Sequence, residues 1–173
     1  LEEITTGVVT ASITNTESIT ELKTLTDTNN NNAYTIVIAE TTVSATDLTD
    51  IYGKTTVAIN ASNVTTITGY KTDVDTVYNA GNSEITGLGN ENIELSNTNI
   101  SVSDANIVAG YTNGAVTATI SATNATDLDD LIAEDNNFTI SVTTTDVTAA
   151  SLNAINAATT LNVTATQVVN ISG

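Results

Sequence analysis

The octapeptide SATDLTDI, residues 44–51, returns with substitutions five more times along the chain. Most copies begin with Ser, Thr or Asn, carry an acid three residues later, and then place two apolar residues three apart. The first side chain can accept a hydrogen bond from the free N–H groups of a helix's first turn, and the acid favours that end of the helix. Each copy therefore predicts the start of a short helix; the others are SITELKTL (18–25), KTDVDTV (71–77), SVSDANIV (101–108), NATDLDDL (124–131) and TAASLNAI (148–155).

Strand-like segments separate these copies. Apolar and polar residues alternate there with period two, as in the inward pairs Ile36/Ile38, Ile140/Val142 and Leu161/Val163. Residues 7–69 also align with residues 114–173 over nearly their whole length. The repeating unit has about two dozen residues, a period typical of repeat architectures.

A unit of this size cannot bury an apolar face alone, so neighbouring units must cover one another. We expect a repeat solenoid, a parallel β-solenoid with short helical corners, forming one domain over residues 1–173. It would have about six to seven rungs, with an irregular rung near residues 63–91. An α/β fold resembling leucine-rich repeats is the alternative, since Val57-x-Ile59 meets that signature loosely.

The composition excludes several classes of protein. The chain has 20 acidic residues against three lysines, giving a net charge of −17, so it cannot neutralise a nucleic-acid backbone or an anionic membrane surface. It has no His and no Cys, the residues that structural zinc sites and most proton shuttles use. No run of 18 apolar residues is present, so we expect no membrane span.

One outward column of the predicted strands is nearly all threonine. Stiff, β-branched threonines suit a pleated surface, and a regular threonine array can match an ice lattice. The neighbouring column is mixed and includes Glu94, which would interrupt such a face. The predicted surface ladder consists of Thr10, Thr35, Thr56, Thr117, Thr139 and Thr160.

Acidic residues are densest between residues 127 and 135. Calcium takes several oxygen ligands, so this cluster could bind it, although the spacing fits no EF-hand. The alternative is a capped helix start with a solvated face. Paired carboxylates could also serve glycoside hydrolysis, but one Phe and three Lys provide little to line a substrate cleft. We therefore expect no enzyme and no cofactor, with calcium left open at Asp127, Asp129, Asp130, Glu134 and Asp135.

Several phrases resemble repeat regions of very large secreted, adhesin-like proteins of marine bacteria and cyanobacteria. They are VSATDLTDIYGKTT (43–56), TDVDTVYNAGNSEITGLGNENIELSNTNISVSDAN (72–106) and VTAASLNAINAATT (147–160). The resemblance implies an extracellular or cell-surface structural role and brings no catalytic residues. The calcium nonapeptide GGxGxD of such proteins is absent here.

Both ends of the chain read as ordinary repeat, and the chain opens at Leu1 rather than Met. Open ends would expose strand edges that pair readily with other chains. We expect either a piece of a longer array or copies that assemble end to end. The expected function is a structural or adhesive stalk or spacer of a large extracellular protein; the alternatives are ice or glycan binding through the threonine face and a self-assembling filament subunit. The partners would be neighbouring repeats of the same or an identical chain, or a surface glycan or ice.

Overall fold

A computed structural model describes residues 7–13, 16–27, 31–79, 84–132 and 134–173. The chain forms two compact units, Leu1–Glu91 and Asn92–Gly173. The strand pairs in the described part of each unit are all parallel, and the paired residues lie roughly two dozen residues apart in sequence.

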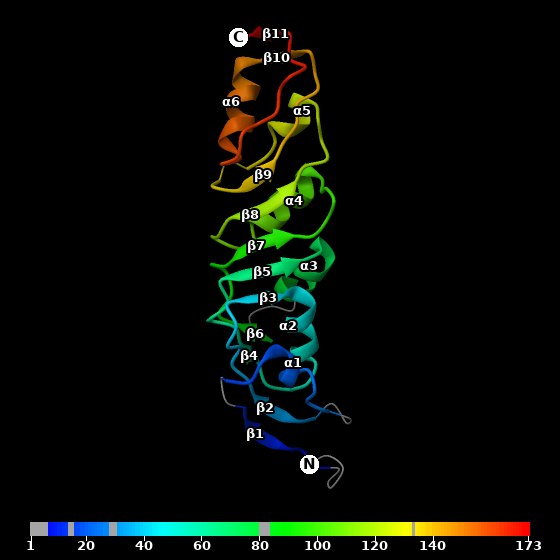
Figure 1. The fold of residues 1–173 in the computed structure, drawn as a ribbon, viewed down its shortest axis with the longest axis vertical. Helices are drawn as coiled ribbons and strands as arrows, with labels where there is room; N and C mark the ends of the chain where they lie inside the picture. Colours follow the sequence, from blue (N-terminus) through cyan, green and yellow to red (C-terminus); the bar gives the residue numbers. More distant parts are fainter. Residues whose placement is uncertain (1–6, 14–15, 28–30, 80–83, 133) are drawn as a thin grey trace. The chain divides into compact units, whose positions relative to one another are not determined.

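The described residues of the first unit form three helices and six short strands (Figure 1). Strand β1 pairs with β2, β3 with β5, and β4 with β6. Helix α2 packs against α1 and α3. The elements are β1 (Thr10–Ser12), α1 (Ile19–Leu22), β2 (Ala33–Thr35), β3 (Thr42–Ser44), α2 (Ala45–Tyr52), β4 (Ile59–Asn60), β5 (Thr66–Gly69), α3 (Lys71–Asn79) and β6 (Ile85–Thr86).

In the second unit, the part that the structure describes forms three helices and five strands (Figure 1). Strand β8 pairs with β7 and β9, and β10 pairs with β11. Helix α6 packs against α5. The elements are β7 (Asn92–Leu95), α4 (Val102–Ala109), β8 (Val116–Thr119), α5 (Ala125–Leu128), β9 (Asn137–Thr139), β10 (Asp146–Thr148), α6 (Ala149–Ala157) and β11 (Asn170–Ser172).

The predicted parallel β-solenoid with short helical corners is wrong. The fold is a small α/β fold, in which six helices accompany parallel strands in the described residues, with β3 paired to β5 in the first unit and β8 paired to β7 and β9 in the second. The reason lies in the lengths of the elements. Helices α2, α3, α4 and α6 run for eight or nine residues, whereas no described strand exceeds four. Helices that connect parallel strands are the defining feature of α/β folds. The count of six to seven repeats in one domain stays a prediction.

The predicted helix starts are confirmed. Five helices have an N-cap side chain that accepts a hydrogen bond from the N–H three residues later, and α1 also has a full capping box with Glu21. In α2, for example, the Oγ of Ser44 accepts from the N–H of Asp47 at 3.1 Å. The caps are Ser18, Ser44, Ser101, Asn124 and Thr148.

The core consists of small aliphatic side chains that face inward from both helices and strands. Leu48 and Val74 of the repeated octapeptide are fully buried in the first unit, as is Leu128 in the second. Of the predicted inward pairs, Ile36/Ile38 and Ile140/Val142 are buried, but Leu161 is 42% exposed. Alternation thus identifies the inward face correctly for these two pairs but not for Leu161.

The irregular segment predicted near residues 63–91 is the C-terminal part of the first unit. Its residues 80–83 lie outside the described residues. Gly87 has φ +88, and a Cβ there would lie 2.8 Å from the Cα of Ser62. Only glycine permits this close approach of two backbones. Glu91, 2% exposed, ends the segment; its carboxylate accepts from the N–H of Gly89 at 2.8 Å and from the hydroxyl of Tyr78.

Candidate functional site

A set of buried polar side chains marks the repeats, one just before each of several strands. Burial of a polar group is unfavourable unless it is hydrogen-bonded. Among the described residues the buried polar or charged side chains are Asn32, Thr55, Glu91, Thr112, Asn136 and Thr159.

Two of these threonines bind the backbone of the preceding repeat. The Oγ1 of Thr55 accepts from the N–H of Tyr34 and donates to its carbonyl, both at 2.9 Å. The Oγ1 of Thr159 donates to the carbonyl of Phe138 at 2.8 Å and accepts from the N–H of Leu161 at 3.1 Å. The two hydroxyls therefore link segments 21 residues apart.

Two buried asparagines do the same through their amides. The Oδ1 of Asn32 accepts from the N–H of Val9 at 2.9 Å, and the Oδ1 of Asn136 accepts from the N–H of Val116 at 2.8 Å. Our sequence analysis missed this set of residues. The similar pentapeptides NAYTI (32–36) and NNFTI (136–140) were the signal that could have revealed the two asparagines.

The predicted threonine ladder is exposed, but in the first unit it does not form one column. The register pairs Thr10 with Ala33 and pairs Thr35 with Ser12. Thr56 lies in a bend outside the strands. Thr10 and Thr35 are therefore two residues out of register, which is a correction to the predicted alignment.

The ladder is broken in the second unit too. The register pairs Thr117 with Asn137 and pairs Thr139 with Thr119, while Thr160 lies in a bend. Because equivalent repeats differ in length by a few residues, counting from one inward pair to the next does not give the true register. The threonine that Thr139 does pair with, Thr119, does not belong to the predicted ladder.

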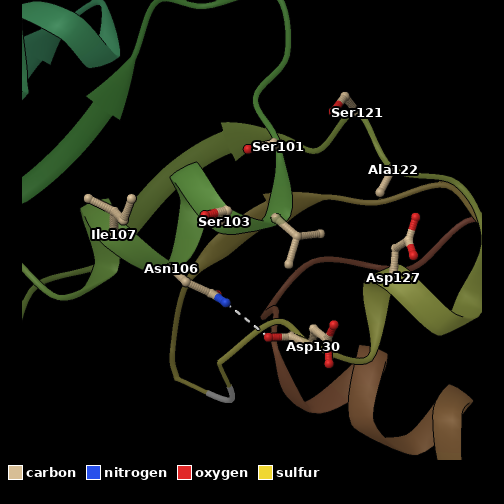
Figure 2. A pocket seen from close by; sticks show the side chains of 9 residues that line it. Ser101, Ser103, Asn106, Ile107, Ser121, Ala122, Asp127 and Asp130 are labelled. Carbon is tan, nitrogen blue, oxygen red and sulfur yellow. Dashed lines mark hydrogen bonds between the residues drawn. The ribbon is translucent and has the colours of Figure 1, made fainter.

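An open groove of about 770 Å³ lies in the second unit (Figure 2). Figure 2 shows the carboxylates of Asp127 and Asp130 on one side and Ile107 on the other. Asn106 spans the groove: its Nδ2 donates to the carbonyl of Asp130 at 2.9 Å, and its Oδ1 accepts from the N–H of Ile132 at 3.0 Å. The groove offers hydroxyl, amide and carboxylate groups without an aromatic ring, so it suits hydrogen bonding better than stacking.

The acidic cluster of residues 127–135 is dispersed in the structure. The carboxylate of Asp127 accepts from the Nδ2 of Asn124 at 2.6 Å, and that of Asp129 accepts from the Oγ of Ser151 at 2.8 Å. Glu134 and Asp135 line a different cavity from Asp127. Within the described ranges, no group of three or more metal-ligating side chains comes together. Calcium binding stays an untested prediction.

The second cavity, about 470 Å³, also lies in the second unit. It is lined by Thr112, Asn113, Gly114, Ala115, Glu134, Asp135 and Asn136. Its two carboxylates are exposed, whereas Asn136 is 1% exposed. A buried amide beside two exposed acids is an arrangement that can both donate and accept hydrogen bonds.

Across the described residues no helix is long and apolar enough to cross a membrane. No protein-family model matches the chain, and no curated protein or solved structure is similar to it.

Proposed function

We propose that this chain is a structural and adhesive repeat segment, a spacer within an extracellular or cell-surface protein, with no catalytic role of its own. The observation that supports this function best is the set of buried side chains that bind the backbone of a neighbouring repeat. Such hydrogen bonds join segments about two dozen residues apart and resist their separation. A spacer needs this property, whereas an enzyme of this size would need a site with an activated nucleophile or base.

Side-chain bonds between neighbouring helices add to this coupling. The Nζ of Lys23 in the cap of α1 lies 2.6 Å from a carboxylate oxygen of Asp47 in α2. The Oγ of Ser151 in α6 donates to Asp129 at the end of α5. Each exposed pair of this kind contributes little to stability, so the coupling between repeats depends mainly on the buried hydrogen bonds.

The mechanical role can be tested by pulling the chain between two reference domains in a single-molecule force experiment. We expect discrete unfolding events whose force falls for Thr55→Val and for Thr159→Val. Thr117→Val is the matched control, because Thr117 is an exposed threonine of β8, and it should leave the force unchanged. Extension at low force without resolved events, or hydrolysis of a polysaccharide by the purified chain, would contradict the proposal.

The extracellular location follows from the resemblance of residues 43–56, 72–106 and 147–160 to secreted repeat proteins, and the net charge of −17 is consistent with it. The same charge opposes binding to nucleic acids. Antibodies raised against the chain should label intact producing cells without permeabilisation. Labelling only after permeabilisation would place the protein inside the cell and overturn this part of the proposal.

Self-assembly is the second candidate function, and an exposed strand supports it. Strand β11 pairs only with β10 among the described strands, and Val169 and Ile171 are 76% and 62% exposed. An exposed apolar edge strand readily accepts another strand. Light scattering over a range of protein and salt concentrations tests this: growth in mass at high salt, where the acidic charge is screened, supports assembly, and a constant monomer mass excludes it.

Ice binding loses its structural support, because it required one regular column of threonines. A thermal hysteresis measurement should therefore show no activity.

A further inference from the structure

The cavity that contains Asn136 holds a buried donor without an acceptor. The Oδ1 of Asn136 accepts from Val116, but its Nδ2 makes no hydrogen bond with any described residue. The residue is 1% exposed and lines the cavity together with the exposed Glu134 and Asp135. Buried polar groups are normally hydrogen-bonded, so an exception calls for an explanation.

The equivalent asparagine in the first unit shows what is missing. The Nδ2 of Asn32 donates to the hydroxyl of Tyr34 at 3.1 Å and to the carbonyl of Thr26 at 3.2 Å. In the second unit the residue two after Asn136 is Phe138, which has no hydroxyl. Both units thus bury the same amide, but only the first provides an acceptor from its own aromatic residue.

The chemistry of the lining decides what kind of group could pair with Nδ2. An amide N–H₂ donates and cannot coordinate a cation. The carboxylates of Glu134 and Asp135 accept hydrogen bonds and repel anions. A neutral hydroxyl-bearing compound satisfies both, because its oxygens can accept from Nδ2 while its hydroxyls donate to the carboxylates.

We propose that this cavity binds a neutral saccharide, with a hydroxyl or ring oxygen accepting from the Nδ2 of Asn136 and neighbouring hydroxyls donating to Glu134 and Asp135. No aromatic side chain lines the cavity, so recognition depends on hydrogen bonds and the affinity is low. The inference rests on the adhesive part of the proposed function and names its ligand class.

The experiment is an NMR titration of the complete 173-residue chain with methyl glycosides of glucose, galactose, mannose and N-acetylglucosamine. The side-chain N–H₂ signal of Asn136 is the readout. We expect at least one glycoside to shift it saturably, in the millimolar range. Glu134→Ala and Asp135→Ala should each weaken the binding about tenfold, the loss of one charge-assisted hydrogen bond. Glu94→Ala, which removes an exposed acid on β7, is the matched control and should leave the affinity unchanged.

A second variant tests the role of the amide directly. Phe138→Tyr offers Nδ2 an internal acceptor and should abolish the shift while Glu134 and Asp135 remain in place. Absence of a saturable shift with all four glycosides would overturn the inference, and so would a shift of the same signals caused by Ca²⁺ alone. The force measurement does not depend on sugar, so failure of this inference can be told apart from failure of the spacer function.

Discussion

Replacing Phe138 by tyrosine should stabilise the second unit, and replacing Tyr34 by phenylalanine should destabilise the first. The two substitutions exchange a single oxygen atom at equivalent places in the two units. In the first unit the hydroxyl of Tyr34 accepts from the Nδ2 of Asn32 and donates to the carbonyl of Thr26 at 3.3 Å. In the second unit the Nδ2 of Asn136 has no described partner.

The magnitude follows from the cost of an unpaired buried group. A typical hydrogen bond contributes about 1 kcal/mol net, and a buried group left unpaired costs about 1–3 kcal/mol. Asn32 keeps its second bond, to the carbonyl of Thr26, so Tyr34→Phe should lower the free energy of unfolding by about 1–2 kcal/mol. Phe138→Tyr should raise it by about 1 kcal/mol, because part of the gain is lost in fitting a hydroxyl beside a ring that is 1% exposed.

The assay is urea unfolding followed by circular dichroism, with amide hydrogen exchange to assign each change to its unit. Protection should fall around residues 32–36 in Tyr34→Phe and rise around residues 136–140 in Phe138→Tyr. A neutral Tyr34→Phe, or a Phe138→Tyr that destabilises the chain, would show that the aromatic hydroxyl and the amide are not coupled as described. The double variant should approach wild-type stability, since the two changes lie in separate units.

Three other changes test the remaining structural arguments. Thr159→Val should lower the free energy of unfolding by about 1–3 kcal/mol by leaving backbone groups unpaired, while Thr117→Val at an exposed position of β8 changes it little, as urea unfolding will show. Ser44→Ala should cost about 1 kcal/mol through loss of the α2 cap, and Ser44→Gly only a few tenths, by the same measurement. The hydrogen bond from Asn170 holds the pKa of the Asp146 carboxyl below its ordinary value, so the native state binds fewer protons than the unfolded state. The stability that results is complete above the unfolded pKa of about 3.9. It is lost as the pH falls through the lower pKa of the folded state. The protection of the β11 amides, measured relative to their intrinsic exchange rates at each pH, should fall over that acidic window. Protection that stays constant there would contradict the pairing.

The sequence alone was sufficient to locate the helices. A capping side chain and the acid three residues after it act on the backbone of the same turn, so the pattern SATDLTDI and its relatives need no tertiary context. The same holds for the inward face of the strands, where period-two alternation identified Ile36, Ile38, Ile140 and Val142 as buried. Alternation did not identify the burial of Leu161 correctly, because burial at that position depends on what covers the last repeat.

Register was beyond reach of the sequence, because it depends on how residues distant in the chain pair. Because the repeats differ in length, Thr10 and Thr35 are two residues out of register and do not form the predicted ladder. The predicted fold class was wrong because the lengths of the helices could not be predicted. Four helices run for eight or nine residues beside short strands, which places the chain among α/β folds, and the length of a helix depends on tertiary packing as well as on its cap.

The candidate site depends most on tertiary structure. Composition showed an acidic chain with no His and no Cys, and local patterns showed where its helices begin. Only the folded chain shows that Asn136 is buried and that Glu134 and Asp135 line the same cavity. Only the folded chain also shows that Tyr34 provides a hydroxyl to Asn32, whereas Phe138 has none to offer Asn136. Caps act within one turn and are written in neighbouring residues, whereas a buried donor and its acceptor meet only when segments far apart in the sequence pack together.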